Sequence, residues 1–343
     1  MHNESLKTIS SAIIQASNVQ EELNKVSELA DFFSAWNLDQ LPGFQERGTI
    51  ELPTASGIAI SSTEAALCTT DYLRTARFIK SVHAALHELI SRFPDQRLRV
   101  LYAGCGPYAT LVLPLLPFFL PEQLELVFLD INDYSIRSCR QLVKKIGFEH
   151  YNITFATIDA TRFENKKKFH LVLTETMFRA LTREPQVAIT EHLRSQLLTD
   201  GIFLPEEIKL DAACTVFIKE PFLKSDPAVT IPPEQVTPFL PQRWPLGCLF
   251  SISHETDFNA LTNGTFTQIE SEYYKIPKEV NNHPDVCIYT QLRIFGTIYL
   301  HSSESLITNP YCVASLANMS GYSHFKLIYN YRSVPGWTCQ LKK

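Results

Sequence analysis

The sequence lacks the cysteine spacings that mark metal and redox sites. Its eight cysteines are scattered, and no two of them are separated by the two residues of a C-x-x-C motif. Zinc ribbons and dithiol redox centres use such spacings, so neither class is indicated and we expect no bound metal. We interpret the cysteines as free thiols in a reducing compartment.

The sequence also lacks a surplus of positive charge and a long apolar run. Its formal net charge is −5, whereas nucleic-acid-binding proteins usually present a strongly basic face. The most apolar stretch, 109–120, is too short to span a bilayer and contains prolines. The first ten residues do not have the basic and then apolar pattern of a secretory signal. We therefore expect a cytoplasmic protein with no nucleic-acid or membrane partner.

What the chain does have is length and apolar content. Its 343 residues, 45% of them hydrophobic, suit two domains with sizeable cores. Apolar residues recur at helical spacing over 5–36. This predicts an N-terminal helical segment within 1–48, and we interpret it as docked on its own domain. A partner-binding helix and a flap over a site are the alternatives.

Residues 49–207 alternate between short apolar runs and amphipathic stretches. The stretch 69–93 has the pattern of a long amphipathic helix. Alternating strands and helices predict a parallel sheet with helices on both faces, and continuous apolar strands are typical of sheets that are covered twice. The expected strands are "RLRVLYAG", "LELVFLD", "NITFATID", "KFHLVLTE" and "GIFLPEEIKLDA".

Residues 208–343 have a different pattern, with strand-like runs separated by glycine and asparagine. The pattern predicts a mostly antiparallel barrel or sandwich. Within it, 226–245 is rich in proline, which cannot donate to a β-ladder. We interpret 226–245 as an extended excursion from this domain.

Polar and glycine residues follow successive strands of the expected parallel sheet. Gly104 and Gly106 lie in the turn that follows the first strand, Asp130 ends the second and Asp159 ends the third. Such a turn allows close backbone approach to a ligand, and doubly wound sheets bind ligands at this edge. Asp130 would accept hydrogen bonds from ribose hydroxyls, and Asp159 would accept one from an adenine amino group. The pattern predicts a nucleoside site.

Two kinds of nucleotide fit these residues. The spacing Gly104-x-Gly106-x-x-Ala109 also fits the dinucleotide fingerprint, so an NAD enzyme is an alternative. Pro107 removes an amide that would cradle a pyrophosphate. A singly nucleosidic, cationic cofactor suits the loop better.

Two glutamates flank the loop after the fourth strand. Glu175 and Glu184 are nine positions apart in "TETMFRALTRE". A guanidinium carries five donors in a fixed planar fork, so two carboxylates on one loop can hold it by charge-assisted bonds. Without a cation the two carboxylates would repel each other and one pKa would rise. For Glu184 alone, a role at the start of the next helix is an equal alternative.

These motifs together resemble class I S-adenosylmethionine-dependent methyltransferases, and among them the protein arginine methyltransferases. "TETMFRALTRE" is similar to the family's double-glutamate loop, and "DYLRT" (71–75) to its Asp-x-x-Arg-Thr. "SGYSHFK" (320–326) resembles its Thr-His-Trp loop, and "DGIFLP" (200–205) its strand that leads into a barrel. Departures from the pattern are Tyr102, Tyr108, Thr176 and Phe325.

The resemblance implies a Rossmann-like class I methyltransferase sheet followed by a β-barrel domain, with S-adenosyl-L-methionine as cofactor. It implies transfer of a methyl group to a guanidino group of a protein, a peptide or a small arginine-like metabolite. It also implies a homodimer, for which 226–245 would supply the contact. The residues it assigns are Glu175, Glu184, Asp71 and His324 for catalysis, Arg74, Gly104, Gly106, Asp130 and Asp159 for the cofactor, and Met177 and Phe325 for the substrate.

In this scheme Asp71 would orient His324 as a proton relay, and Arg74 would bind the cofactor carboxylate. Each residue also has a plainer reading. Arg74 could pair with Asp71 one turn back on the helix, and His324 could be an ordinary polar residue at a strand start. The alternatives for the whole chain are a methyltransferase with another N or O acceptor and a non-catalytic binding protein of the same fold.

Overall fold

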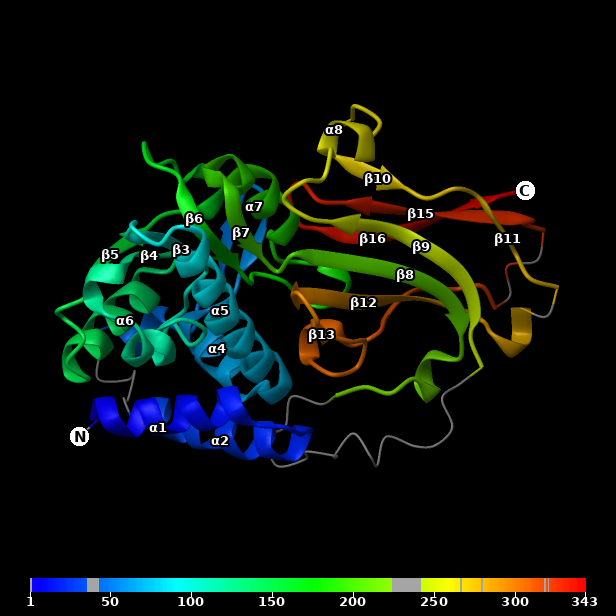
Figure 1. Ribbon diagram of the computed structural model, residues 1–343. Coiled ribbons are helices and arrows are strands. Elements are labelled where there is room, and N and C mark those ends of the chain that lie inside the picture. Colours follow the sequence, from blue (N-terminus) through cyan, green and yellow to red (C-terminus); the bar gives the residue numbers. More distant parts are fainter. Residues whose placement is uncertain are drawn as a thin grey trace.

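The computed structural model describes residues 2–35, 43–223, 242–265, 267–278, 280–317, 319 and 321–343. Figure 1 shows a helix-covered sheet on one side of the molecule and long antiparallel strands on the other. Most of the proline-rich stretch 226–245 lies outside the described residues, and only 242–245 falls within them. Among the residues described, no helix is both long and apolar enough to cross a membrane.

The first half contains the expected parallel sheet, in the order β5-β4-β3-β6-β7. The central strand β3 and its neighbour β6 are buried along their whole length, which explains why their sequences are largely apolar runs. The strands are β3 (Leu98–Ala103), β4 (Leu124–Asp130), β5 (Asn152–Thr157), β6 (Phe169–Thr174) and β7 (Leu197–Leu204).

Helices cover both faces of this sheet, as the alternation predicted. On β3, Val100 and Tyr102 belong to the core that includes α5 (Tyr72–Arg92) and α6 (Asp133–Lys145). Leu101 and Ala103 point the other way, into a core with Ile189 of α7 (Gln186–Leu193). Because successive residues of a strand face opposite sides, one strand contributes to both cores. The architecture of the first half is confirmed.

The N-terminal segment forms two helices rather than one. α1 (His2–Gln15) and α2 (Val19–Ser34) are separated at Asn18, whose side chain caps α2 by accepting a 3.0 Å hydrogen bond from the Glu21 amide. Both helices bury their apolar face in the main core, where Leu6 and Phe33 are fully buried. The segment is therefore docked on its own domain.

A short segment joins these helices to the sheet. It consists of α3 (Phe44–Arg47), β1 (Leu52–Thr54), β2 (Gly57–Ala59) and α4 (Ser62–Leu67), followed by the turn η2 (Cys68–Thr70). β1 and β2 pair as a hairpin. The Ile58 amide of β2 donates to the Arg183 carbonyl at 2.8 Å, so the hairpin lies against the loop that carries the two glutamates.

The second half consists of antiparallel sheets, as expected. One has the order β13-β12-β8-β9 with β14 beside β12, and the other has the order β10-β15-β11 with β16 beside β15. The strands are β8 (Glu207–Thr215), β9 (Trp244–Ile252), β10 (Gln268–Glu270), β11 (Tyr274–Lys275), β12 (Asp285–Phe295), β13 (Ile298–Leu300), β14 (Tyr311–Ser315), β15 (His324–Asn330) and β16 (Gly336–Lys342). A short helix, α8 (Phe258–Leu261), connects β9 to β10.

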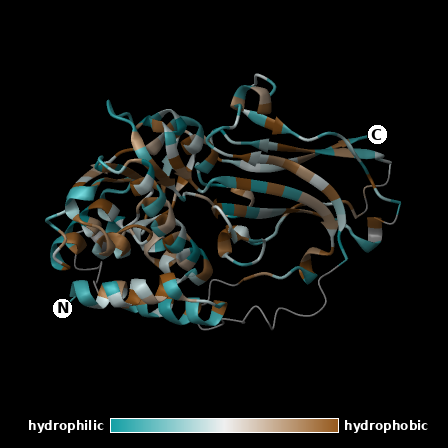
Figure 2. Ribbon diagram, viewed as in Figure 1, coloured by the Kyte–Doolittle hydropathy of each residue, from teal (hydrophilic) through white to brown (hydrophobic). Residues whose placement is uncertain are grey.

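The two antiparallel sheets share a core. Cys214 and Val286 of one sheet are buried together with Phe325 and Leu327 of the other. Strands such as β8 alternate in hydropathy along their length, as Figure 2 shows, because one face of each sheet is covered and the other is not. The run 201–212, which reads as one strand in the sequence, divides between β7 of the parallel sheet and β8 of the antiparallel part.

Candidate functional site

A cavity of about 430 Å³ lies at the carboxyl edge of the parallel sheet. This is the edge at which doubly wound sheets bind ligands, and the volume is within the range of small-molecule sites. Its walls come from the ends of β3, β4 and β6, from the segment 54–74, and from Leu306 and Ile307 of the antiparallel half. The two halves of the molecule therefore form one site.

The glycine turn after β3 forms one wall. Gly104 has φ +73° and Gly106 has φ +63°, both in the left-handed region that favours glycine. A Cβ on Gly104 would lie 2.4 Å from Cγ2 of Thr176, which is too close for any side chain. The Gly104 amide donates to the Leu129 carbonyl at 2.8 Å, which ties the turn to the end of β4.

Asp130, at the end of β4, is held against this turn. Its Oδ2 accepts from the Gly106 amide at 2.9 Å and its Oδ1 accepts from the Asn132 amide at 2.8 Å. Each oxygen retains a lone pair for a ligand hydroxyl. Burial raises the pKa of Asp130 to about 6 in spite of these bonds. Asp159 also lines the cavity, and its Oδ1 accepts from the Thr161 amide at 2.9 Å.

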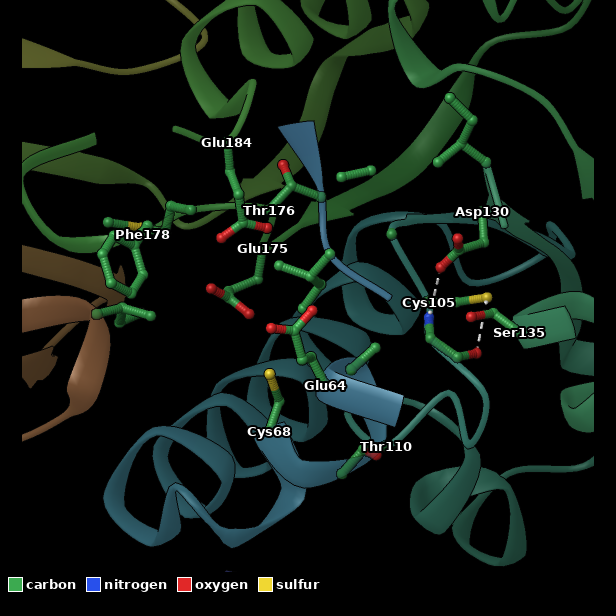
Figure 3. A pocket seen from close by; sticks show the side chains of 18 of the residues that line it. Glu64, Cys68, Cys105, Thr110, Asp130, Ser135, Glu175, Thr176, Phe178 and Glu184 are labelled. Atoms are coloured by element: carbon green, nitrogen blue, oxygen red, sulfur yellow. Dashed lines mark hydrogen bonds between the residues drawn. The ribbon is translucent and has the colours of Figure 1, made fainter. Parts of the chain in front are cut away.

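Glu175 and Glu184 both line the cavity that contains the glycine turn. In Figure 3 their carboxylates point into the same space. Glu175 follows β6, is 8% exposed, and forms an ion pair with Arg74 of α5. Burial raises the pKa of Glu184 to about 7, although Arg74 and Arg183 oppose the rise. One glutamate thus has a raised pKa, with burial rather than mutual repulsion as its main cause.

The loop that carries Glu184 has an unusual backbone. Ala180, Leu181 and Arg183 have φ of 54°, 57° and 71°, a region that costs energy for residues other than glycine. Antiparallel strands hold the loop in this conformation. The Trp337 indole donates to the Ala180 carbonyl at 2.8 Å, and the Tyr329 hydroxyl donates to the Leu181 carbonyl at 2.7 Å.

Asp71 and Arg74 also line the cavity, but their partners differ from those expected. Oδ2 of Asp71 accepts from the Ser305 hydroxyl at 2.6 Å and from the Leu306 amide at 3.0 Å. Burial raises the pKa of Asp71, against the effects of Arg74 and these hydrogen bonds. Asp71 therefore connects the start of α5 to the antiparallel half.

The structure does not bring His324 to Asp71. His324 begins β15 opposite Lys342, and its Nδ1 lies 2.8 Å from the Ser323 hydroxyl. Neither His324 nor Phe325 lines the cavity. Phe325 is fully buried in the core between the antiparallel sheets. The expected relay between Asp71 and His324 is therefore not formed in this structure. The expected contact of Phe325 with a substrate is not formed in this cavity either.

The register of β15 explains this correction. The end of β15 near Tyr329 contacts the glutamate loop, so the start of the strand, His324, lies at the other end of the sheet. Figure 1 shows that end close to the C-terminus. Ser305 and Leu306 lie beside Asp71, where the resemblance would put the histidine. Leu306 begins the turn η11 (Leu306–Thr308), and Ser305 is the residue before it.

Three further expectations concern Met177, Tyr102 and Tyr108. Met177 is 2% exposed and lines the cavity, as the substrate assignment requires. Tyr102 also lines the cavity, and burial raises its pKa. Tyr108 stacks on Phe33 of α2, with ring centroids 5.1 Å apart and planes 8° apart. Tyr108 therefore helps to hold the N-terminal helices.

Sequence reasoning missed the part of the wall contributed by α4 and by the turn η2 that follows it. Glu64 and Cys68 line the cavity opposite the two loop glutamates (Figure 3). Ser61 and Glu64 form a capping box at the start of α4. The Ser-x-x-Glu spacing is a helix-start signal and could have located α4 in the sequence. Nothing local indicates that α4 faces the cavity.

Among the described residues, most of the charged side chains that line the cavity are acidic. Two guanidinium groups, Arg74 and Arg183, face a larger set of carboxylates, namely Glu64, Asp71, Asp130, Asp159, Glu175 and Glu184. Such a site favours cationic ligands. Nε of Arg74 is buried without a hydrogen-bond partner, so a ligand acceptor could also be bound there.

Comparisons with known proteins add the following. No protein-family model matches the sequence, and no curated protein matches it. A similar solved structure is the Trypanosoma brucei PRMT1 enzyme–prozyme heterotetrameric complex with AdoHcy, with 11% sequence identity over 80% of this chain and 96% of that chain and a TM-score of 0.47. The fold assignment depends on the strand order of this chain and not on that similarity.

Proposed function

We propose that this chain is an S-adenosylmethionine-dependent N-methyltransferase whose acceptor is a guanidino group. The observation that carries the proposal is the location of Glu175 and Glu184 in one cavity with the Gly104–Gly106 turn. One pocket thus offers a nucleoside-binding edge and an acidic clamp. Bound S-adenosylmethionine would supply a methyl group on a positively charged sulfur.

The residues of the edge fit this cofactor. Gly104 and Gly106 line the cavity, and a side chain at Gly104 would meet Thr176, so glycine lets the turn pack against the residues after β6. Asp130 can accept from ribose hydroxyls, and Asp159 from an adenine amino group. The buried, unpartnered Nε of Arg74 can donate to the cofactor carboxylate. The acidic surroundings suit a sulfonium charge.

The loop glutamates would hold the acceptor. Glu175 is kept in place by Arg74, and Glu184 faces the same space. A guanidinium between them is fixed in position and its charge is compensated. Bonds to its nitrogens also prevent even delocalisation of its charge, so one nitrogen becomes a better nucleophile.

A guanidinium nitrogen that gains a methyl group must release a proton. With His324 far from the cavity, Glu184 is the group best suited to receive it. Its pKa of about 7 suits a general base at neutral pH, because a base is most efficient when its pKa is close to the pH of the reaction. Glu184 would accept the proton on its carboxylate and later release it to solvent.

Two measurements test the proposal. Mass spectrometry after incubation of arginine and arginine peptides with a deuterated-methyl cofactor should show a labelled guanidino group. Glu175→Gln should reduce turnover by about 100-fold or more, whereas the exposed control Glu164→Gln should not. Equal turnover of Glu175→Gln and wild type would remove the acidic clamp from the mechanism.

A binding protein without catalysis is the second candidate. The ion pair with Arg74 occupies Glu175, and Tyr102 stands where the resembled family has an acid. Calorimetry with S-adenosylhomocysteine separates the candidates when combined with the label experiment. Micromolar binding together with no label on any acceptor would favour the binding protein.

A further inference from the structure

The structure contains a second cavity, of about 370 Å³. Consecutive residues of the glutamate loop line the two cavities, because Phe178 lines the first and Arg179 lines the second. The second cavity has mostly apolar walls, made by Phe217, Ile218, Phe222, Pro310, Tyr311 and Cys312, with Arg179 and Glu220 as its charged residues.

We propose that the second cavity is a subsite for a carboxylate attached to an apolar body. We further propose that this carboxylate belongs to the same molecule whose guanidino group enters the first cavity. This second part rests on the proposed function, whereas the carboxylate subsite itself does not.

The positive charge of Arg179 has no acidic partner among the described residues. None of the ion pairs found there includes Arg179, and its Nε is buried without a hydrogen-bond partner. Three aromatic rings surround the guanidinium, with centroids 5.1 Å (Phe178), 5.2 Å (Phe222) and 6.0 Å (Tyr311) from Cζ. The rings stabilise the cation only in part, so an anion would gain a charge-assisted bond.

Glu220, the acid in this cavity, is already compensated. Its Oε2 accepts from Arg243, with an N–O distance of 2.5 Å, and its Oε1 accepts from the Tyr289 hydroxyl at 2.8 Å. The Thr215 hydroxyl donates to Oε1 at 2.5 Å. With Glu220 neutralised by Arg243, the charge left in the cavity is that of Arg179.

The backbone beside Arg179 is fixed rather than adaptable. Ala180 and Leu181, the next two residues, have positive φ. Besides the bonds from Trp337 and Tyr329, the Ala180 amide donates to the Thr290 hydroxyl at 3.2 Å. A strained backbone that several contacts hold in place is typical of a binding site.

These features together favour a carboxylate. A guanidinium fork matches two carboxylate oxygens, and the aromatic walls suit carbon chains or rings next to the acid. The neighbouring acidic cavity attracts a cation. An acceptor with a guanidinium at one end and a carboxylate at the other would satisfy both cavities.

The first experimental arm compares arginine with agmatine, which differ by the carboxylate. Binding is measured by calorimetry in the presence of S-adenosylhomocysteine. We expect wild type to bind arginine about 10- to 100-fold more tightly than agmatine. Arg179→Gln should abolish this preference and leave agmatine binding unchanged. Arg140→Gln is the matched control, since it also removes a guanidinium above an aromatic ring, Phe155.

The second arm tests the subsite without the proposed function. Phenylacetate carries an apolar ring and a carboxylate but no guanidinium. It should bind wild type saturably and should not bind Arg179→Gln. Arg179→Lys keeps the charge and loses the fork, so it should bind more weakly than wild type, and it serves as the test if Arg179→Gln does not fold.

The outcomes of the two arms are distinguishable. If neither arginine nor agmatine binds but phenylacetate binding depends on Arg179, the guanidino acceptor is wrong and the subsite stands. Two results together would refute the subsite. Wild type would show no preference for arginine over agmatine, and phenylacetate would either bind wild type and the Arg179 variants equally or not bind wild type. Phenylacetate binding that depends on Arg179 without any arginine preference would show that the carboxylate comes from another molecule.

Discussion

Arg74 of α5 and Glu175 at the end of β6 form a buried ion pair inside the cavity. Their side chains are 9% and 4% exposed, and they come from segments a hundred residues apart. The pair connects the helix that carries Asp71 to the loop that carries the second glutamate. The Arg74 guanidinium compensates the charge of a carboxylate that would otherwise be buried and unpaired.

The ion pair predicts a specific pattern of stability. Arg74→Met should lower the free energy of unfolding by about 3–5 kcal/mol, because it leaves the Glu175 carboxylate buried and unpaired. The double variant Arg74→Met, Glu175→Met should recover most of that loss. Urea unfolding measures both changes.

The exposed pair Arg137–Asp133 provides the control for this experiment. Its side chains are 55% and 46% exposed, so Arg137→Gln should change the free energy by no more than about 0.5 kcal/mol. A double variant as unstable as Arg74→Met would show that packing, and not the unpaired charge, causes the loss.

Glu184 predicts a loss of stability as pH rises. Its pKa in the folded protein is about 7, against an ordinary value of 4.5, so the folded state holds the proton more tightly than the unfolded state. The contribution of Glu184 is intact below pH 4.5 and is lost between pH 4.5 and 7, by about 3 kcal/mol. Glu184→Gln should remove this part of the pH profile and should be the more stable protein above pH 7.

Denaturant unfolding at pH 4.5, 6 and 8 measures the effect. Glu164 is exposed, and Glu164→Gln should retain the wild-type pH profile. A profile of Glu184→Gln that parallels wild type would show that Glu184 titrates normally in the folded protein.

We expect a substitution by alanine to have different consequences at Gly104 and at Gly147. Both have positive φ, at 73° and 82°. A Cβ at Gly104 would lie 2.4 Å from Thr176, whereas a Cβ at Gly147 would meet nothing within 4 Å. Both alanine variants should be destabilised by about 1 kcal/mol of backbone strain, but only Gly104→Ala should also displace Thr176.

Calorimetry with S-adenosylhomocysteine checks this difference. We expect Gly104→Ala to lose at least tenfold in affinity, an amount worth about 1.4 kcal/mol, and Gly147→Ala to bind as wild type does. Unchanged binding by Gly104→Ala would place the nucleoside elsewhere.

We expect substitutions of Asp71 and of His324 to give opposite results in an activity assay. His324 lies outside the cavity wall, so His324→Ala should leave turnover unchanged. Asp71→Ala removes the acceptor for Ser305 and Leu306 and should reduce both turnover and stability, the latter by about 1–3 kcal/mol. Loss of activity in His324→Ala, with stability intact, would reinstate the relay.

The homodimer also stays a prediction, because residues 226–241 of the expected contact segment lie outside the described residues. Replacing 226–241 with a short glycine–serine linker should give a monomer. Light scattering measures the mass, and an unchanged mass would assign the contact to another surface.

The sequence by itself was sufficient for the features that depend on neighbouring residues. Apolar runs that stop at Gly104, Asp130 and Glu175 located the strand ends, and parallel strands bring their carboxyl ends to one edge. That is why these residues could be placed in a common site before the structure was known. The Ser61–Glu64 capping box was equally readable, although its meaning for the cavity was not.

The tertiary structure alone decided which distant segments meet. His324 resembles a catalytic histidine in its local motif, but the register of β15 places it at the far end of the sheet, and Ser305 takes the position beside Asp71. The ion pair between Arg74 and Glu175, and the enclosure of Arg179 by aromatic rings from separate segments, likewise depend on packing. Side-chain partners across a fold are set by strand register and domain contacts, and no local pattern in a single sequence records them.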